Sequence, residues 1–194
     1  MRVGGTLRAK FIESCHVEAA GPILVANGIL NAQVHTLDRL ETGLRGLVVG
    51  GRLTAANGIA VEQLGSPSGQ RTEVCCGIDY SVQARLEWIR DRNQALAARL
   101  REVRARQGTA GASRQRLEDL EARLRAAIGQ LNEAARKLVL TVDANEAATL
   151  EIRGSVYPGC YLEICHVPYP VSREMKRVRF RLDRVTGKIL GERF

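Results

Sequence analysis

The chain has 194 residues, of which 45% are hydrophobic and 26% are charged, and its formal net charge is +8 at pH 7. This composition supplies a buried core and excludes wholesale disorder. The longest apolar stretch, around residues 21–30, is broken by Asn27 and Gly28 and is shorter than the roughly 18 residues that a membrane-spanning helix needs. The sequence therefore predicts one ordinary domain or two small ones, with no membrane span.

The cysteines and the first residues indicate the compartment. The chain holds five cysteines, an odd number, and no Cys-x-x-Cys motif, which argues against a disulfide framework and for a reducing environment. The first residues, Met-Arg-Val-Gly-Gly, lack the apolar segment of a signal peptide. A cytoplasmic location is expected.

Residues 1–78 predict a short β-solenoid. Apolar residues recur about every five or six positions, at Leu7, Ile12, Val17, Ile23, Ile29 and Val34. The segment Gly21–Ile29 is echoed by Gly51–Ile59 thirty residues later, and Gly5–Ala9 is a shorter echo sixteen residues before the first. Three short strands per coil, each ended by Gly or Asn, would give coils of about 16–18 residues. An antiparallel sheet of short strands is the alternative.

Residues 79–140 predict a long antiparallel coiled-coil hairpin, because apolar residues alternate at spacings of four and three in two arms. The seam of the first arm is Val82, Leu86, Ile89, Asn93, Leu96, Leu100 and Val103. The seam of the second arm is Leu117, Leu120, Leu124, Ala127, Leu131, Ala134 and Leu138. Between the arms, the glycines of Gln107–Ser113 end one helix and Ser113 is expected to cap the next.

The arithmetic of the two arms predicts their register. Folded about residue 110, facing seam residues have numbers that add to 220, which places Asn93 opposite Ala127. A lone polar residue in a seam can fix the register at a cost in stability. Each arm of about 27 residues spans roughly 40 Å.

Residues 141–194 return to strand patterns. Leu150–Arg153 alternates, Gly154–Gly159 predicts a turn, and Thr186–Gly187 predicts a tight turn before a last strand. One strand alternates apolar and basic residues: Val178, Phe180 and Leu182 on one face, and Arg177, Arg179 and Arg181 on the other. We expect this β-segment to complete or cap the solenoid, so the fold class is mainly β with a helical insertion.

Four segments resemble the flagellar assembly protein A family: Gly4–Glu13, Gly46–Gly51, Thr72-Glu-Val and Gly154–Gly159. The resemblance covers essentially the whole chain. It implies that this sequence begins inside the family's solenoid, after the N-terminal domain and early coils that family members usually have. It implies a β-solenoid with a long coiled-coil hairpin, in agreement with the patterns above. It also implies a scaffold at the cell pole and in flagellar assembly, with regulatory or flagellar proteins as partners, and it brings no catalytic residue or cofactor.

Two Cys-His pairs, Cys15–His16 and Cys165–His166, suggest a zinc site, since thiolate and imidazole both suit zinc. The pairs would meet if the last segment packed across the solenoid. Adjacent side chains of a strand point to opposite faces, however, and Cys75–Cys76 has the same geometry. We therefore expect small cysteines that fill the solenoid and no metal.

Two further groups of residues suggest other functions. His35 is the one histidine well inside the repeat, and a solenoid acyltransferase would use such a base, but no partner is placed beside it. The face of Arg177, Arg179 and Arg181, with Arg173 and Arg184 nearby, is a candidate surface for nucleic acid or another anionic surface. Only eight aromatic residues are present, and single-strand binders depend on stacking aromatics.

The sequence thus predicts a non-enzymatic scaffold that presents a solenoid and a coiled coil to protein partners. Self-association through the open ends of the solenoid is also expected, since uncovered coils expose backbone groups and apolar residues. Nucleic-acid binding is the second hypothesis and acyl transfer the third.

Overall fold

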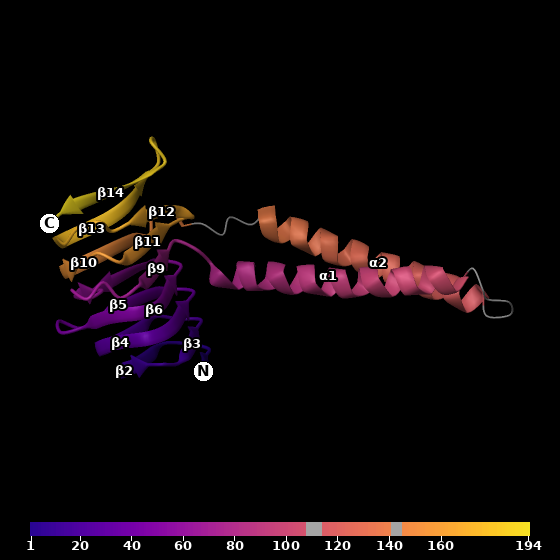
Figure 1. Cartoon of the computed structure of the whole chain (residues 1–194), viewed down its shortest axis with the longest axis horizontal. Coiled ribbons are helices and arrows are strands. Elements are labelled where there is room, and N and C mark those ends of the chain that lie inside the picture. The colour runs from indigo at the N-terminus through magenta and orange to yellow at the C-terminus, as the bar shows by residue number, and fades with distance from the viewer. Residues whose placement is uncertain (108–113, 141–144) are drawn as a thin grey trace. The chain divides into compact units, whose positions relative to one another are not determined.

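The computed structural model describes residues 1–107, 114–140 and 145–194 (Figure 1). It is mainly β and divides into two units. One comprises Met1–Tyr80 with Asp143–Phe194, and the other is Ser81–Val142. The first unit is the β-solenoid and the second holds nearly all of the two long helices, α1 (Tyr80–Gln107) and α2 (Arg114–Leu140).

The strands before the helices are β1 (Arg2–Val3), β2 (Leu7–Glu13), β3 (His16–Ala19), β4 (Ile23–Thr36), β5 (Arg39–Thr42), β6 (Leu47–Ala55), β7 (Gly58–Val61), β8 (Gln63–Leu64) and β9 (Thr72–Cys76). The strands after them are β10 (Thr149–Val156), β11 (Cys160–Ile164), β12 (Val167–Pro170), β13 (Met175–Asp183) and β14 (Lys188–Arg193).

Parallel pairing between successive coils builds a solenoid of about four turns. Side A consists of β1, β3, the end of β4, the end of β6, β9 and β11. Side B consists of the starts of β2 and β4, then β5, β7 and β10. Side C consists of the end of β2, the middle of β4, the start of β6, β8 and the last residue of β10. The alternative of an antiparallel sheet is therefore wrong for residues 1–78.

The core is made of inward side chains that stack from coil to coil. On side A the column is Val17, Val34, Leu53, Val74 and Leu162, each at most 1% exposed. The six residues of the predicted spacing pair with one another on neighbouring coils: Leu7 with Ile23, Ile12 with Ile29, and Val17 with Val34. As the chain passes from one side of the solenoid to the next, the next apolar residue of the pattern again points inward. The spacing of five or six residues therefore predicts which side chains form the core.

The thirty-residue echo is not the coil repeat. Ile23 pairs with Leu40 on side B, whereas Leu53, its counterpart in the echo, pairs with Val34 on side A. Asn27-Gly28 lies within β4 where side B passes into side C, and Asn57-Gly58 leads from β6 into β7 where side A passes into side B. The echo therefore repeats a local turn signal at two different corners rather than a coil. The sixteen-residue echo is the true repeat, because it brings Leu7 against Ile23.

The helices interrupt the solenoid without ending it. The backbone N–H of Asn145 donates to the carbonyl of Gly77 at 2.8 Å, so the two ends of the interruption meet. Beyond it, β10 stacks in parallel on β7 and β8, and β11 stacks on β9. The C-terminal segment therefore first continues the coils.

Three antiparallel strands then cover the last coil: β12 pairs with β11, β13 with β10, and β14 with β13. Phe180 of β13 is fully buried in the core, and its ring lies 5.2 Å from that of Tyr169. As predicted, Val178 and Phe180 face inward between exposed arginines. Gly187, at φ 63°, lies in the turn before β14.

Candidate functional site

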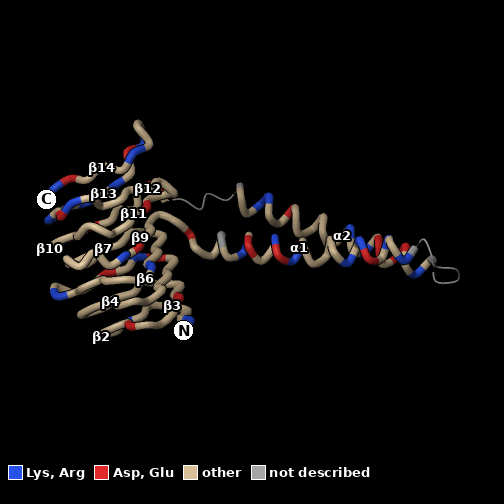
Figure 2. Tube along the Cα trace, viewed as in Figure 1, with Lys and Arg blue, Asp and Glu red and all other residues tan. Residues whose placement is uncertain are grey.

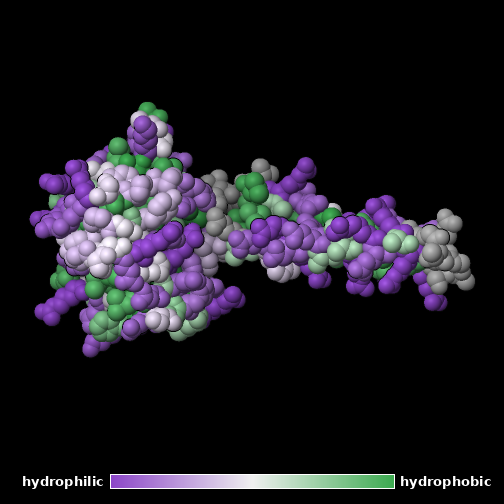
Figure 3. Space-filling view, in the orientation of Figure 1, coloured by the Kyte–Doolittle hydropathy of each residue, from purple (hydrophilic) through white to green (hydrophobic). Residues whose placement is uncertain are grey.

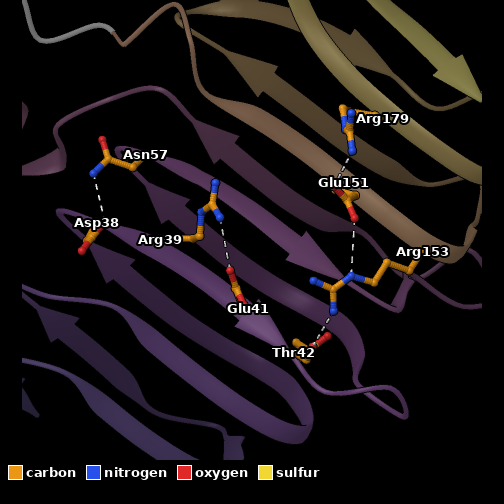
Figure 4. Close-up of polar contacts among 8 residues, drawn as sticks. All are labelled: Asp38, Arg39, Glu41, Thr42, Asn57, Glu151, Arg153 and Arg179. Carbon is orange, nitrogen blue, oxygen red and sulfur yellow. Dashed lines mark hydrogen bonds and ion pairs between the residues drawn. The ribbon is translucent and has the colours of Figure 1, made fainter. Parts of the chain in front are cut away.

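The basic strand β13 is largely neutralised by carboxylates. Arg179 lies 3.1 Å from Glu151 of β10, and Glu151 in turn lies 3.5 Å from Arg153 (Figure 4). Arg153 also donates to the carbonyl of Thr42 at 3.4 Å. A network on the outer surface of side B thus holds Arg179, with its guanidinium 5.1 Å from the centre of the Phe194 ring.

Arg181 is neutralised in a similar way, whereas Arg177 has no ion pair with any residue that the structure describes. Arg181 lies 2.6 Å from Glu192 of β14, and this hydrogen bond lowers the pKa of the Glu192 carboxyl. Arg177 has φ 50°, where the regular pairing of β10 with β13 breaks between Ile152 and Ser155. The three arginines are therefore not one uniform phosphate-binding face.

Side A carries a polar cluster on its outer surface. His16 makes hydrogen bonds with Glu18 at 2.8 Å and Gln33 at 3.1 Å, and Arg2 lies 2.7 Å from the same Glu18. The hydrogen bond to His16 is the main cause of a lowered pKa for Glu18. The parallel register places Arg2 and Gln33 one coil away from β3, on either side, which explains why residues 16 or 17 positions apart in the sequence touch.

His35 lies in the middle of this cluster. Its ring is 5.2 Å from the rings of both His16 and Tyr80, and its Nδ1 atom is buried with no hydrogen-bond partner among the described residues. Burial lowers the pKa of His35, and the nearby His16 and Arg52 lower it further. The lowered pKa favours the neutral imidazole, and among the described residues no carboxylate makes a hydrogen bond to the His35 ring.

Cys75 lies further along side A, between a cation and an anion. Arg52 is 3.7 Å from its sulfur, and Glu163 is 3.8 Å away on the other side. Burial, followed by the charge of Glu163, raises the pKa of Cys75 to about 11. At neutral pH it is therefore a protonated, poorly nucleophilic thiol.

The two Cys-His pairs do not meet. His16 lies on β3, and Cys165 follows β11, four strand spacings or roughly 19 Å along the stack. His16 pairs with Glu18, and His166 lies 3.6 Å from Glu163. The zinc hypothesis fails because the last coil packs at the opposite end from the first. No group of three metal-ligating side chains occurs in the described part of the chain.

The helical unit buries a stripe close to the expected seam. In α1, Val82, Ile89 and Val103 are buried, and the other four seam residues (Leu86, Asn93, Leu96 and Leu100) are half-buried. In α2, Leu124 is buried, and Leu117, Leu120, Ala127, Leu131 and Leu138 are half-buried. Ala134 is exposed, however, and Ala135 is half-buried in its place. A straight α-helix has about 3.6 residues per turn, so a strict heptad pattern drifts by about 20° per heptad around the helix. Towards the end of α2 this drift brings Ala135, one position after the predicted Ala134, onto the buried stripe.

Two polar contacts join the helices. Asn93 donates to Asn132 at 2.8 Å, and Arg104 lies 2.9 Å from Glu121. The numbers in both pairs add to 225 rather than 220, so Asn93 meets a residue five positions beyond Ala127. Asn132, Arg104 and Glu121 lie outside the predicted seam, so the facing pairs of the seam itself stay a prediction. The expected Ser113 cap and the glycines of 108–111 lie outside the described residues.

The helices also expose apolar side chains that the sequence reading missed. Trp88, the single tryptophan, is 60% exposed, and Val139 is 70% exposed. Val139, Asn132 and Arg136 line an open groove of about 900 Å³ on α2. Charges of both signs alternate along the helices, and hydrophobic atoms lie among the hydrophilic ones (Figures 2 and 3). The exposure of Trp88 could have been predicted from the sequence, because Trp88 falls between the seam positions Leu86 and Ile89 and so lies off the seam.

Within the described residues, neither helix combines the length and apolar character that crossing a membrane requires. The family model of the Flagellar Assembly Protein A beta solenoid domain matches residues 1–189. No curated protein and no solved structure matches the chain.

Proposed function

The chain belongs to the flagellar assembly protein A family, and we propose that it is a non-enzymatic scaffold that binds flagellar or regulatory proteins in the cytoplasm. None of the five cysteines is joined in a disulfide, which supports a reducing compartment. The coil stack continues across the helical insertion, with Ile164 on Cys76 and Leu150 on Ile59. Such a stack can hold inserted helices without depending on them for its core.

The helices are proposed to form an antiparallel coiled-coil hairpin. From Asn93 to Arg104 the position along α1 advances by eleven residues, while the contacted position on α2 recedes by eleven, from Asn132 to Glu121. A constant sum of residue numbers is the signature of two helices that run in opposite directions. The buried stripes described above supply the apolar seam.

Exposed Trp88 is the observation that carries the scaffold proposal. A tryptophan side chain that is 60% exposed leaves a large apolar surface in water, and tryptophan is among the residues most enriched at the energetic centres of protein interfaces. Trp88 and the α2 groove at Val139 give the helical unit apolar surface that its own seam does not use. A protein partner would bury it.

Self-association through the ends of the solenoid is part of the same proposal. Among the described residues, β2 pairs only with β4, so one edge of β2 has no strand beside it. Phe11 of this strand is 55% exposed and Leu7 is half-buried. Unpaired strand edges with apolar neighbours favour association. Light scattering at rising concentration, with Leu7→Lys as the comparison, tests this part alone.

Affinity capture from the source organism tests the partner proposal. The bait is the tagged chain, compared with Trp88→Ala and with Val185→Ala, a matched control whose side chain is 93% exposed on the solenoid unit. We expect flagellar or regulatory proteins to be retained by the chain and by Val185→Ala, and to fall roughly tenfold with Trp88→Ala.

Two results would contradict the proposal. Equal retention by Trp88→Ala would show that the exposed tryptophan is not the binding surface. Absence of any flagellar or regulatory protein from every capture, together with normal flagella in a strain that lacks the gene, would reject the scaffold function itself.

A further inference from the structure

The C-terminal strands form a small hollow with an apolar floor and a basic rim. It has a volume of about 220 Å³ and is lined by Arg173, Glu174, Met175, Val178, Gly191 and Arg193. A more open hollow of about 480 Å³ shares Glu174 and Arg193 with it and adds Lys176, Arg177 and Phe194. We call the two together the cap groove, since most of its lining comes from β13 and β14. These two strands lie at the opposite end of the solenoid from β2 (Figure 1).

The backbone of β13 creates the basic rim. Val178 pairs with Ile152, and Met175 pairs with Val156, so both pack against the core although they are three residues apart. Regular alternation does not allow this, and Arg177, at φ 50°, breaks it. Lys176 and Arg177 are consequently both exposed at the groove. The carbonyl of Arg177 accepts the N–H of Phe194 at 3.1 Å, which fixes this irregular backbone.

Gly191 opens the floor of the hollow. A Cβ atom at this position would lie 3.0 Å from Cε1 of Phe180 and 3.3 Å from Cγ2 of Val178, so a side chain would crowd both. Glycine leaves the space open above Val178 and Met175. The floor can therefore receive the methylene groups of a ligand side chain.

The charge around the groove is uncompensated. Within the described residues, the side chains of Arg173, Arg177 and Arg193 have no carboxylate at ion-pair distance. The one acidic side chain of the lining, Glu174, lies 3.5 Å from Lys176. Arg179 and Arg181, the next basic residues of β13, are paired with Glu151 and Glu192. Along β13, the uncompensated positive charge among the described residues therefore ends at Arg177 and does not continue to Arg179 and Arg181.

We propose that the cap groove binds the carboxylate side chains of an acidic peptide segment in a protein partner. Guanidinium groups bind carboxylates through paired charge-assisted hydrogen bonds, and the apolar floor suits the stem of a glutamate. A nucleic acid needs cations along several phosphates and gains from stacking aromatics, whereas the arginines beyond the groove are neutralised. The cap groove belongs to the solenoid unit, whereas the scaffold proposal depends on Trp88 of the helical unit. The two proposals therefore depend on different residues, and either can fail without the other.

A fluorescence anisotropy titration tests the groove with the intact chain. The probe is a fluorescein-labelled peptide Gly-Glu-Leu-Glu-Gly, compared with Gly-Gln-Leu-Gln-Gly and with a labelled single-stranded oligonucleotide. The variants are Arg173→Gln with Arg193→Gln, and the matched control Arg179→Gln. Thermal melting of each variant shows whether it is folded, and Arg177→Gln on its own gives a milder change if the double variant melts early.

We expect the Glu peptide to bind, with an affinity that falls as salt rises from about 50 to about 500 mM. The double variant should lose roughly tenfold or more in affinity, while Arg179→Gln changes it less than about twofold. Equal binding of the Gln peptide, equal binding by the folded double variant, tighter binding of the oligonucleotide, or no binding of the Glu peptide at about 1 mM would each overturn the proposal.

Discussion

Leu162 lies directly on Val74 in the core of side A, although the whole helical insertion separates them in the sequence. The pairing of β11 on β9 continues the column that begins with Val17 and Val34. Solenoid coils interact mainly with their neighbours, so a coil can be interrupted by a long insertion if its two ends return to the same place. The hydrogen bond from Asn145 to Gly77 marks that return.

Removal of the insertion is therefore predicted to leave the solenoid folded. Residues 81–142 would be replaced by a short Gly-Ser linker between Tyr80 and Asp143. The helical signal in circular dichroism should disappear, while the β signal and a cooperative thermal transition persist. A broad, non-cooperative transition in the shortened chain would show that the helices belong to the main core.

The stacked leucines are predicted to carry much of the stability of the solenoid. Leu162→Ala removes a side chain that is 0% exposed and should lower the free energy of unfolding by about 2–5 kcal/mol. Leu44→Ala alters a leucine that is 82% exposed and should change it by less than about 0.5 kcal/mol. Urea unfolding followed by circular dichroism measures both. Similar losses for the two variants would contradict the assignment of side A as core.

The inward positions of the solenoid could be predicted because each coil repeats the same spacing, and Leu7, Ile12 and Val17 all follow it. Other features have no local sequence signal. The left-handed backbone of Arg177 is imposed by the pairing of β13 with β10, so alternation alone placed Arg177 beside Arg179 and Arg181. The ion pairs of those two arginines come from Glu151 and Glu192, on neighbouring strands.

The contact between Asn93 and Asn132 predicts opposite effects of two changes in the helical unit. Asn93 Oδ1 is buried and has no hydrogen-bond partner among the described residues. Asn132→Ala removes the acceptor of its amide group and should destabilise the helices by about 1–2 kcal/mol. Asn93→Leu with Asn132→Leu removes both polar groups and should raise the melting temperature of the helical signal. Equal melting of all three proteins would mean that the amide contact is not formed.

The stability of the solenoid is predicted to depend on the protonation of His35. Burial lowers its pKa in the folded chain below the ordinary value near 6.5. The unfolded chain thus binds more protons in this range, and the free energy of unfolding should fall as pH drops through about 6.5 towards the folded pKa. Glu18, whose pKa is also lowered, acts in the same direction at lower pH.

Urea unfolding at pH values from about 7.5 to about 5 measures this dependence. His35→Gln should flatten the upper part of the curve, above the range in which Glu18 titrates. A slope that is the same in His35→Gln and in the parent chain would remove His35 as its source.

The cysteines are predicted to differ sharply in their reaction with iodoacetamide near neutral pH. Cys15 is exposed, whereas Cys75, Cys76 and Cys160 are buried. Burial raises the pKa of Cys75 and of Cys160 to about 11, and it raises that of Cys76 as well. Because the thiolate is the reactive form, Cys15 should be alkylated first and the buried three only when urea unfolds the chain. Peptide mass spectrometry identifies the modified residues. Rapid labelling of Cys75 in the folded chain would show that it is neither buried nor protonated, and would contradict its position between Arg52 and Glu163.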